Sequence, residues 1–357
     1  MDNANALFFD GHAGRLRLAH LPRPNLKRGE TLVRVEAATI CGSDVHTIHK
    51  RREVLVPTIL GHEILGFVED FGEDASRFDA RGGNLEIGDR VVWGVVAHCG
   101  ACGFCGRGLT QKCSQATKYG HEKAEFGSEW TGGFGEWCVL APGTTVVKVP
   151  FEIPAGLLCP ASCSTATVFS AMEAAGDLSG KTVLITGAGL LGATAILVSR
   201  FYGAKKIFVV EALEYRRLKA IELGASDAFP PGDLLRNVEL RPIDVFLEFS
   251  GSNSAWEVGT RFLSTGGVAV LIGSVFPSMD ASINLETVVR RMWTIRGVHN
   301  YGPRHLIRAV DFLTNSEIAL SLTGLVGPWF TMGQYTEALE QAVKPEIYRT
   351  GFLMERK

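Results

Sequence analysis

The chain has 357 residues, of which 46% are apolar and 21% charged, so it is long enough for two domains with sizeable cores and too apolar to be disordered. Its 36 lysines and arginines balance 38 acidic residues, and a formal net charge of −2 gives no basic footprint for nucleic acid. We find no apolar stretch of the about 18 residues that a membrane helix needs, and no secretory signal. We therefore expect a cytoplasmic protein that binds neither nucleic acid nor membranes.

The first third of the chain predicts a β-rich domain. Residues 30–38 alternate polar and apolar side chains, as a half-buried strand does, and residues 61–70 and 90–96 are further β-like runs. The polar segment 73–86 between them predicts a surface loop. Another short strand lies in the glycine-containing segment 132–140. Short strands separated by glycine turns are typical of a barrel-like fold.

The pattern changes after about residue 163, where β-branched apolar runs alternate with helical spacings. Helices are expected over residues 165–175, 190–201 and 215–223. Buried strands are expected over residues 181–186, 206–211, 244–248 and 268–272. Strand and helix in alternation predict an α/β domain with a doubly wound parallel sheet. The end of the chain returns to mixed character.

A glycine-rich turn, Gly187-Ala188-Gly189-Leu190-Leu191-Gly192, lies between the first of these strands and the next helix. In the dinucleotide-binding motif the first glycine makes the turn, the second lets a pyrophosphate approach, and the third lets the helix pack on the strand. Unpaired N–H groups at the helix N-terminus then face the phosphates. The residues expected to contact a dinucleotide are Gly187, Gly189, Leu190, Leu191 and Gly192. The alternative is a turn in an α/β domain that binds nothing.

An acidic residue, Glu211, ends the second strand of this domain, 24 residues after Gly187. A carboxylate at that position can accept hydrogen bonds from the adenosine ribose hydroxyls and repels a 2′-phosphate. The sequence therefore favours NAD over NADP. Arg216 and Arg217 follow, and they belong either to the adenine side of the cofactor site or to a solvated first turn of the next helix.

Four of the eight cysteines fall within 15 residues, with the spacing C-x2-C-x2-C-x7-C. They are Cys99, Cys102, Cys105 and Cys113. Clustered cysteines in a cytosolic chain of this size indicate a metal site rather than disulfides. Four thiolates close a tetrahedral shell around zinc and leave no open position, so we expect a structural zinc ion. An iron–sulfur cluster is the chemical alternative.

A second set of metal ligands is predicted from Cys41, His62 and Cys163. Each residue alone is weak evidence, because lone histidines and cysteines are more often structural. Together they give two cysteines and one histidine with an open fourth position, the ligand pattern of catalytic zinc. The open position would hold water or an alcohol oxygen, and zinc lowers the pKa of a bound hydroxyl.

Polar residues beside the first of these cysteines are candidates for moving a proton. Ser43 is expected to take the proton of an alcohol, and His46 to deliver it to solvent. Asp44 is expected to orient His62 from outside the metal shell. With the ligands, these residues predict a dehydrogenase site for alcohols.

Together these motifs resemble the zinc-dependent alcohol dehydrogenases of the medium-chain dehydrogenase/reductase superfamily. The likeness rests on Cys41-Gly42-Ser43-Asp44-Val45-His46, Gly61-His62-Glu63, Gly88-Asp89-Arg90-Val91, the four-cysteine lobe, Gly132-Gly133-Phe134, the Gly187 turn with Glu211, and Arg349-Thr350. It covers nearly the whole chain. The resemblance implies a GroES-like catalytic domain over residues 1–163, to which residues 299–357 return, and a Rossmann NAD-binding domain over residues 164–298.

The resemblance also bears on the identity of the third zinc ligand. Cys41 and His62 look like the first two ligands of the family. Cys163 precedes a helix at the family's spacing, whereas Cys159 precedes a proline and lies too early, so Cys163 is preferred. Cys138 lies in a predicted strand, where it is expected to pack in the core.

Other residues take roles from the resemblance alone. Glu63 looks like the acid that approaches the metal during ligand exchange, and Ser43 with His46 looks like the proton relay. Arg349 looks like the arginine that reaches the cofactor pyrophosphate, and Thr167 is expected to contact the cofactor. These assignments describe an NAD-dependent zinc alcohol dehydrogenase with one catalytic and one structural Zn²⁺.

Two alternative functions are compatible with these motifs. A carbonyl reductase would use the same residues in the reverse direction. A non-catalytic dinucleotide-binding protein is the alternative from another class, but none of the ligand or relay residues is missing.

Because the family commonly pairs Rossmann sheets through a late strand, here residues 292–298, a homodimer or homotetramer is expected.

The substrate is expected to be a small, polar and possibly anionic molecule. Segments of the chain look most like the phosphonate-catabolism-associated branch of the family, and cyclitols or other polyols are the alternative. The candidate substrate contacts are Arg51, Arg52, His299 and Asn300. Arginine in a cleft can bind two oxygens of a phosphonate or carboxylate at once, but a run of charges such as residues 50–52 is often a solvated loop.

Overall fold

The computed structural model describes residues 3–233, 242–276 and 280–355. The chain forms two compact units. One consists of Met1–Ala166 together with Gly302–Lys357, and the other of Thr167–Tyr301. Each boundary lies three residues beyond the one expected from the sequence.

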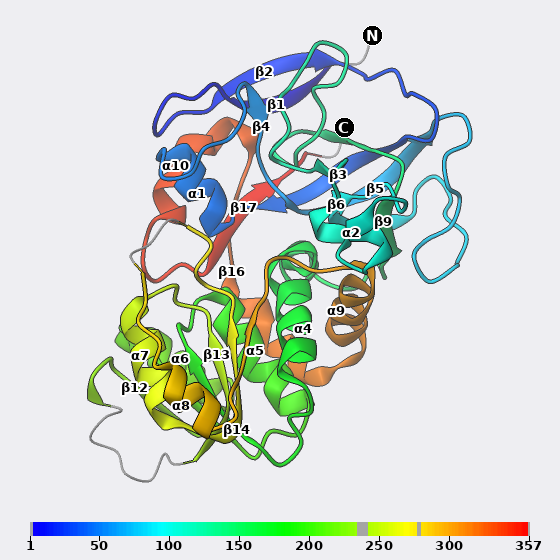
Figure 1. The fold of residues 1–357 in the computed structure, drawn as a ribbon. Helices are drawn as coiled ribbons and strands as arrows, with labels where there is room; N and C mark the ends of the chain where they lie inside the picture. The colour runs from blue at the N-terminus through cyan, green and yellow to red at the C-terminus, as the bar shows by residue number, and fades with distance from the viewer. Residues whose placement is uncertain (1–2, 234–241, 277–279, 356–357) are drawn as a thin grey trace. The chain divides into compact units, whose positions relative to one another are not determined.

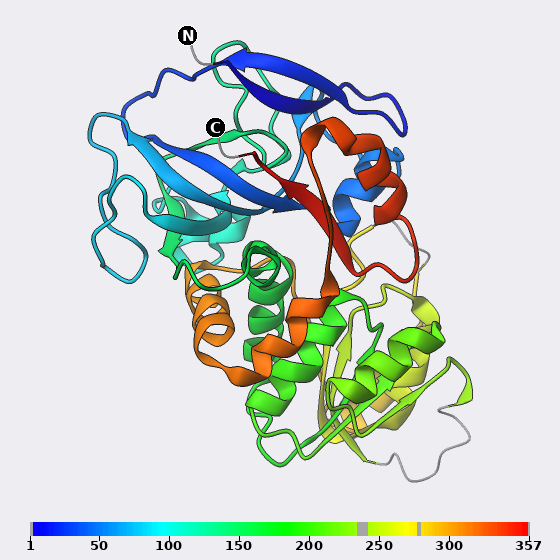
Figure 2. The ribbon, with the colours of Figure 1, turned by 180° about the vertical axis from the view of Figure 1, so that it is seen from behind.

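The first unit is built on an eight-stranded sheet. Its strands are β3 (Thr31–Thr39), β5 (Glu63–Phe71), β6 (Arg90–Ala97), β7 (Thr117–Lys118), β8 (Trp137–Leu140), β9 (Thr144–Lys148), β16 (Val326–Phe330) and β17 (Arg349–Leu353). Six follow the order β16-β17-β3-β5-β6-β7, while β8 pairs with β3 and β9 with β6. The last strand, β17, runs antiparallel to β3 with Gly351 opposite Thr39, and Figure 2 shows it in red beside the blue strand. The C-terminal strand therefore completes a sheet that begins near the N-terminus.

A three-stranded sheet, β2-β1-β4, completes the β structure of this unit. Its strands are β1 (Asn3–Phe9), β2 (Arg17–Pro22) and β4 (Thr58–Ile59). One apolar cluster contains side chains from both sheets, including Leu7, Ile59, Trp93 and Phe352. The β-rich domain predicted from the sequence is confirmed, and Cys138 is buried in this core as expected.

Short helices connect and cover these strands. They are α1 (Gly42–Ile48), α2 (Gly103–Gly106), α3 (Ala155–Leu158), α9 (Pro303–Asn315) and α10 (Tyr335–Ala342). Helices α1 and α10, from opposite ends of the chain, lie side by side in Figures 1 and 2. Elements that are distant in sequence therefore meet around the start of α1.

The second unit contains a six-stranded sheet whose strands are all parallel. They are β10 (Thr182–Thr186), β11 (Lys206–Val210), β12 (Asp227–Phe229), β13 (Ile243–Glu248), β14 (Leu263–Leu271) and β15 (Thr294–Gly297). Their order is β12-β11-β10-β13-β14-β15, so the direction of winding reverses between β10 and β13. Ligands of such sheets bind outside the carboxyl ends of the strands at this reversal.

Helices α5 (Leu190–Phe201), α6 (Glu214–Glu222) and α7 (Asn253–Phe262) pack against the parallel sheet (Figure 1). Helix α4 (Ser164–Ala175) begins at the boundary between the units, and α8 (Leu285–Arg290) precedes the edge strand. The doubly wound α/β domain predicted from the sequence is thus confirmed.

No single helix in the described ranges is long and apolar enough to cross a bilayer, although the bent pair 155–162 and 164–175 meets the same length and composition test.

The turn from β10 to α5 brings backbone segments unusually close together. Gly187 has a φ of +84°, a left-handed conformation that glycine adopts without strain. A Cβ atom at Gly192 would lie 1.9 Å from the carbonyl oxygen of Gly187, so only glycine fits there. At Gly189, in contrast, the nearest atom to a Cβ would be Nη1 of Arg216, at 3.8 Å. The third glycine of the motif is therefore a packing requirement, whereas the second leaves space beside the backbone.

We expect Gly192→Ala to destabilise the protein and Gly189→Ala, its matched control, to leave stability nearly unchanged. Forcing a methyl group into a packed position costs about 1–3 kcal/mol. Because roughly 2–4 °C of melting temperature correspond to each kcal/mol in domains of comparable size, Gly192→Ala should melt several degrees lower. Thermal unfolding of both variants without added nucleotide checks this, and equal melting temperatures would contradict it.

Candidate active site

Three predicted metal ligands from distant parts of the chain converge in the first unit. Cys41 directly precedes α1, His62 directly precedes β5, and Cys163 directly follows a short 3-10 helix, Cys159–Ser162. Their candidate ligand atoms all lie within 4.8 Å of one another. Cys41 and His62 are buried, and Cys163 is partly exposed. One ion at this point can therefore contact all three side chains.

Residues of α1 hold the first two ligands in place. One oxygen of Asp44, Oδ2, accepts the backbone N–H of Cys41 at 2.8 Å, and the other, Oδ1, lies 3.3 Å from Nδ1 of His62. Because Asp44 occupies the Nδ1 side of the ring, Nε2 is the nitrogen left for a metal. The hydroxyl Oγ of Ser43 lies 3.3 Å from that Nε2, next to the ligand atoms.

The choice between the two candidate third ligands follows from where their sulfurs point. The thiol of Cys159 is fully buried and donates to the carbonyl oxygen of Ala37 at 3.5 Å. Ser162, at the end of the same short helix, donates to the carbonyl of His62 at 3.1 Å and brings the following residue, Cys163, beside the other ligands. Cys159 is therefore part of the core, and Cys163 completes the set.

Without metal, these side chains hold protons that a bound metal ion would displace. A hydrogen bond with Cys163 and the positive charges of Arg349 and His62 hold the pKa of Cys41 well below its usual value, against the effect of burial. Although burial disfavours the imidazolium, Asp44 and Cys41 raise the pKa of His62 to about 10. Zinc binds thiolate and neutral imidazole, so binding here displaces protons. Two cysteines and one histidine leave the fourth position of zinc open.

Behind the ligands lies a buried ion pair that joins the two ends of the first unit. Nε and Nη2 of Arg349 donate to the two carboxylate oxygens of Glu63 at 3.0 and 3.2 Å, and Nη2 also lies 3.4 Å from Sγ of Cys41. Thr39 donates its hydroxyl to Glu63 at 2.5 Å. Burial raises the pKa of Glu63, and the charge of Arg349 partly offsets that effect. No sequence pattern predicts this pair, because its members are 286 residues apart.

This ion pair occupies the two side chains for which the resemblance predicts roles at the metal and the cofactor. Both oxygens of Glu63 accept hydrogen bonds from Arg349, so the carboxylate is turned toward the arginine. Arg349 is buried and its third nitrogen, Nη1, donates to the carbonyl of Tyr348 at 2.9 Å. Contact of Arg349 with a cofactor pyrophosphate, and approach of Glu63 to a metal, stay predictions.

His46 lies on α1 and is partly buried. Burial and the positive charge of Arg51 lower its pKa below the usual value for histidine. A neutral imidazole can accept a proton, so His46 is ready to act as a base at neutral pH. Ser43 and His46 are three residues apart on one helix, a spacing that places them on the same face.

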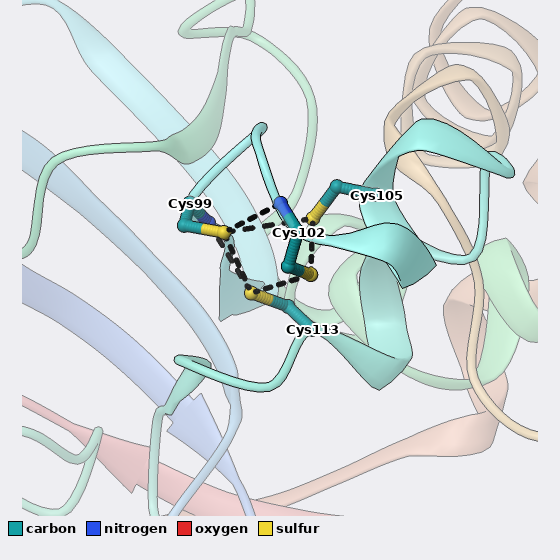
Figure 3. Close-up of side chains that lie close together, drawn as sticks. All are labelled: Cys99, Cys102, Cys105 and Cys113. Atoms are coloured by element: carbon teal, nitrogen blue, oxygen red, sulfur yellow. Dashed lines mark hydrogen bonds between the residues drawn. The ribbon is translucent and has the colours of Figure 1, made fainter.

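The four-cysteine lobe forms a second, separate ligand cluster (Figure 3). Cys99 lies 3.5 Å from Cys113 and 4.0 Å from Cys105, and Cys102 lies 3.5 Å from Cys105 and 4.0 Å from Cys113, all measured between sulfurs. Four thiolates at the Zn–S distance of about 2.3 Å form a tetrahedron with edges of about 3.8 Å, which these values bracket. An iron–sulfur cluster would spread the sulfurs over several irons and hold them farther apart. The geometry therefore fits one zinc ion.

The predicted cofactor residues lie around the turn between β10 and α5 in the second unit. The carboxylate of Glu211 follows β11 directly and accepts the backbone N–H groups of Ala188 at 2.7 Å and Leu213 at 3.0 Å. Arg216 places its guanidinium beside Gly189. Arg217 instead donates to the carbonyls of Glu211 and Ala212, at 2.9 and 2.7 Å. Of the two arginines, only Arg216 therefore lies beside the glycine turn.

The remaining predicted residues are spread over both units. Thr167 is buried in α4, and Leu190 and Leu191 form the first turn of α5. Arg51 is exposed and Arg52 is partly buried, both directly after α1. His299 is exposed, and Asn300 has a φ of +57°, both just after β15 in the second unit. The structure thus gathers the zinc ligands and the relay, and it leaves the predicted substrate residues in separate units.

Comparison with known families assigns both units. Residues 27–151 match the alcohol dehydrogenase GroES-like domain, and residues 191–315 match the zinc-binding dehydrogenase domain. The L-threonine 3-dehydrogenase of Pyrococcus horikoshii is 33% identical over 309 residues, which are 83% of this chain and 81% of that protein. The chain belongs to the zinc-dependent alcohol dehydrogenase family. The two ligand clusters are accordingly the catalytic and the structural zinc site of a zinc-dependent dehydrogenase.

Other members of this family give the same result. The L-threonine 3-dehydrogenase of Deinococcus radiodurans is 30% identical and covers 89% of this chain and 88% of its own length. Among solved structures, an alcohol dehydrogenase from Thermotoga maritima superposes with a TM-score of 0.91 at 26% identity, over 99% of this chain and 100% of its own. Benzyl alcohol dehydrogenase from Acinetobacter calcoaceticus shares the fold at a TM-score of 0.86 and 22% identity, with the chains covered to 99% and 100%.

We expect two zinc ions per chain, each lost separately. Cys163→Ala should reduce the zinc content to one ion and leave the melting temperature nearly unchanged, because the open site has fewer protein ligands. Cys102→Ala should also leave one ion but lower the melting temperature clearly, because a closed structural site adds its binding energy to folding. Elemental analysis and thermal unfolding check both. One zinc ion in the unmodified protein, or the visible absorption of an iron–sulfur cluster, would contradict this.

Proposed function

We propose that this family member is an NAD-dependent dehydrogenase that interconverts a small polar alcohol carrying an anionic group and its carbonyl partner. The observation that carries the proposal is the convergence of Cys41, His62 and Cys163, with Ser43 beside them. Zinc held there supplies a Lewis acid that makes an alcohol hydroxyl more acidic, and NAD accepts the hydride. The relatives named L-threonine 3-dehydrogenase support a small polar substrate, since threonine is a hydroxy acid.

In this proposal a short proton path runs along α1. The hydroxyl of Ser43 lies next to the ligand nitrogen of His62 and is the group available to take the proton of the alcohol. His46, three residues further on the same face, accepts it as a neutral imidazole and releases it to solvent. Thr47 donates its hydroxyl to the carbonyl of Ser43 at 2.9 Å and steadies that turn of the helix.

The preference for NAD rests on Glu211. Its two hydrogen bonds to Ala188 and Leu213 hold the carboxylate at the glycine turn, where a ribose would lie. A 2′-phosphate placed there would meet a fixed negative charge. Arg216 opposes this effect only in part, because its guanidinium lies toward Gly189 and the phosphate side of the turn.

The edge strand β15 supports assembly into a homodimer or homotetramer. It ends the six-stranded sheet, so one side of its backbone has no partner strand within the described part of the chain. The neighbouring α8 exposes apolar side chains: Leu285 is 70% exposed, Val289 75% and, just after the helix, Met292 68%. Pairing of this edge with a second copy would cover them, since native proteins seldom leave an apolar edge uncovered.

The proposed function predicts zinc- and NAD-dependent oxidation of small polar alcohols. Zinc-loaded protein should reduce NAD with at least some hydroxy acids of three to five carbon atoms, L-threonine among them, and should use NADP much less efficiently. Absorbance of the reduced nucleotide across a panel of neutral and anionic alcohols measures this. No turnover with any alcohol or carbonyl, or a preference for polyols without charge, would contradict it.

A variant of Glu211 separates cofactor preference from activity. Glu211→Gln keeps the size of the side chain and one acceptor oxygen but removes the charge, so the ratio of kcat/KM for NAD to that for NADP should fall at least tenfold. Glu214→Gln, an acidic residue at the start of α6, is the matched control and should leave the ratio unchanged. An unmodified protein that uses both nucleotides equally would show that Glu211 does not select between them.

The rate should fall in acid as His46 takes up a proton. Its pKa is lowered in the folded protein, so this loss is expected below the usual titration range of histidine. Arg51→Gln removes a positive charge that lowers this pKa, so its acid limb should move to higher pH. Arg28→Gln, whose arginine pairs with Asp74, is the control and should leave the profile in place. A profile of kcat against pH that is identical in all three proteins would exclude His46 from the relay.

A further inference from the structure

The segment that follows β7 lies directly against the catalytic zinc ligands. A Cβ atom at Gly120 would lie 2.6 Å from the carbonyl oxygen of Gly61, so the two backbones touch. The ring of His121 lies 5.3 Å from the ring of the ligand His62, measured between centroids, and its Nδ1 is 2.8 Å from the carbonyl oxygen of Tyr119. Residues 117–121 therefore form one side of the space around His62.

Two cations of this region form no ion pair with the carboxylates that the structure describes. Lys118 pairs with Val96 in the sheet and is half-buried, and Arg52 is half-buried after α1. The segment after β7 also contacts the chain that follows α1, because the backbone N–H of Ala124 donates to the carbonyl oxygen of Pro57 at 2.7 Å. In keeping with this contact, the charge of Arg52 lowers the pKa of Lys118, and both cations lower the pKa of His121. The two cations therefore belong to the neighbourhood of His121, whose ring lies beside that of His62.

The lack of an acidic partner is visible in the pKa of Lys118. Burial, and then the repulsion from Arg52, lower the pKa of Lys118 to about 8. Half-buried like charges without an acidic partner destabilise a fold, and such groups cluster at functional sites. The carboxylate of Glu122 has a smaller effect on this pKa than burial or Arg52, and it accepts the backbone N–H of Lys118 at 2.7 Å. An anion brought from outside would offset both charges.

We propose that Lys118 and Arg52 form an anion-binding site that holds the carboxylate or phosphonate group of the substrate while its hydroxyl reaches the Cys41, His62 and Cys163 cluster. This rests on the proposed function and names the side chains that select the substrate. The planar guanidinium of Arg52 can bind two oxygens of one oxyanion, and the Lys118 ammonium adds a mobile point charge. A neutral polyol would leave both charges uncompensated. Of the arginines suggested by the sequence, the site uses Arg52 and not the exposed Arg51.

The test compares anionic alcohols with neutral alcohols of the same length in the zinc-loaded, full-length protein with NAD. The pairs are 3-hydroxybutyrate with butan-2-ol and 2-hydroxyethylphosphonate with propan-1-ol, which also separates carboxylate from phosphonate recognition. In Lys118→Gln, kcat/KM for the anionic members should fall about 10- to 100-fold, the range of one charge-assisted hydrogen bond. The values for the neutral members should change less than twofold. Arg52→Gln should act in the same direction.

Two control variants isolate the role of the charge. Lys118→Arg keeps a cation and should retain most of the activity on anionic substrates. Lys123→Gln removes an exposed lysine from the same segment and should behave like the unmodified protein. Calorimetric titration with inorganic phosphate gives a readout without turnover, and phosphate should bind more weakly to Lys118→Gln.

Each other outcome overturns the proposal in a recognisable way. Equal losses for anionic and neutral members in Lys118→Gln would show a structural role only. An unmodified protein with no preference for the anionic members would show that no anion site exists. If no alcohol is oxidised at all, the proposed function fails by itself, and the phosphate titration still decides: unchanged affinity in Lys118→Gln would reject the site.

Discussion

The buried ion pair between Glu63 and Arg349 is the interaction on which the active site depends. It joins the first residue of β5 to the first residue of β17, and Arg349 also lies against the sulfur of Cys41. A buried ion pair is stable only when its polar atoms are fully hydrogen-bonded, and removing one partner typically costs about 3–5 kcal/mol. Here Thr39 and the carbonyl of Tyr348 complete the bonding. The pair therefore fixes the C-terminal strand and the ligand-bearing segments in one arrangement.

Local features were readable from the sequence because their partners are near in the chain. The four cysteines of the structural site fall within 15 residues, and the glycine turn needs only β10, α5 and their own backbone. The choice between Cys159 and Cys163 was harder, since the residues are only four positions apart. The 3-10 helix between them turns one sulfur to the carbonyl of Ala37 and the other to the ligands. The spacing to the following helix therefore selected the right cysteine, and the short 3-10 helix supplies the physical reason.

Long-range electrostatics were not readable in this way. The partner of Glu63 lies 286 residues away, and many arginines could have filled that position. The lack of a partner at Lys118 and Arg52 is a property of the folded neighbourhood, so no pattern in the chain announces it. The run of charges after α1 could not separate the exposed Arg51 from the half-buried Arg52. Only packing distinguishes a solvated charge from one that is held without compensation.

The charges of Lys118 and Arg52 stay uncompensated whether or not zinc is bound. Without metal, the hydrogen bond with Cys41 and burial raise the pKa of Cys163 well above its usual value, so its thiol is neutral and offsets no charge on Lys118. A bound Zn²⁺ would offset the charges of two thiolates, so the loaded ligand cluster is also close to neutral as a whole. Neither form of the cluster therefore supplies the negative charge that the two cations lack. An anion beside the ligands would supply it in both forms.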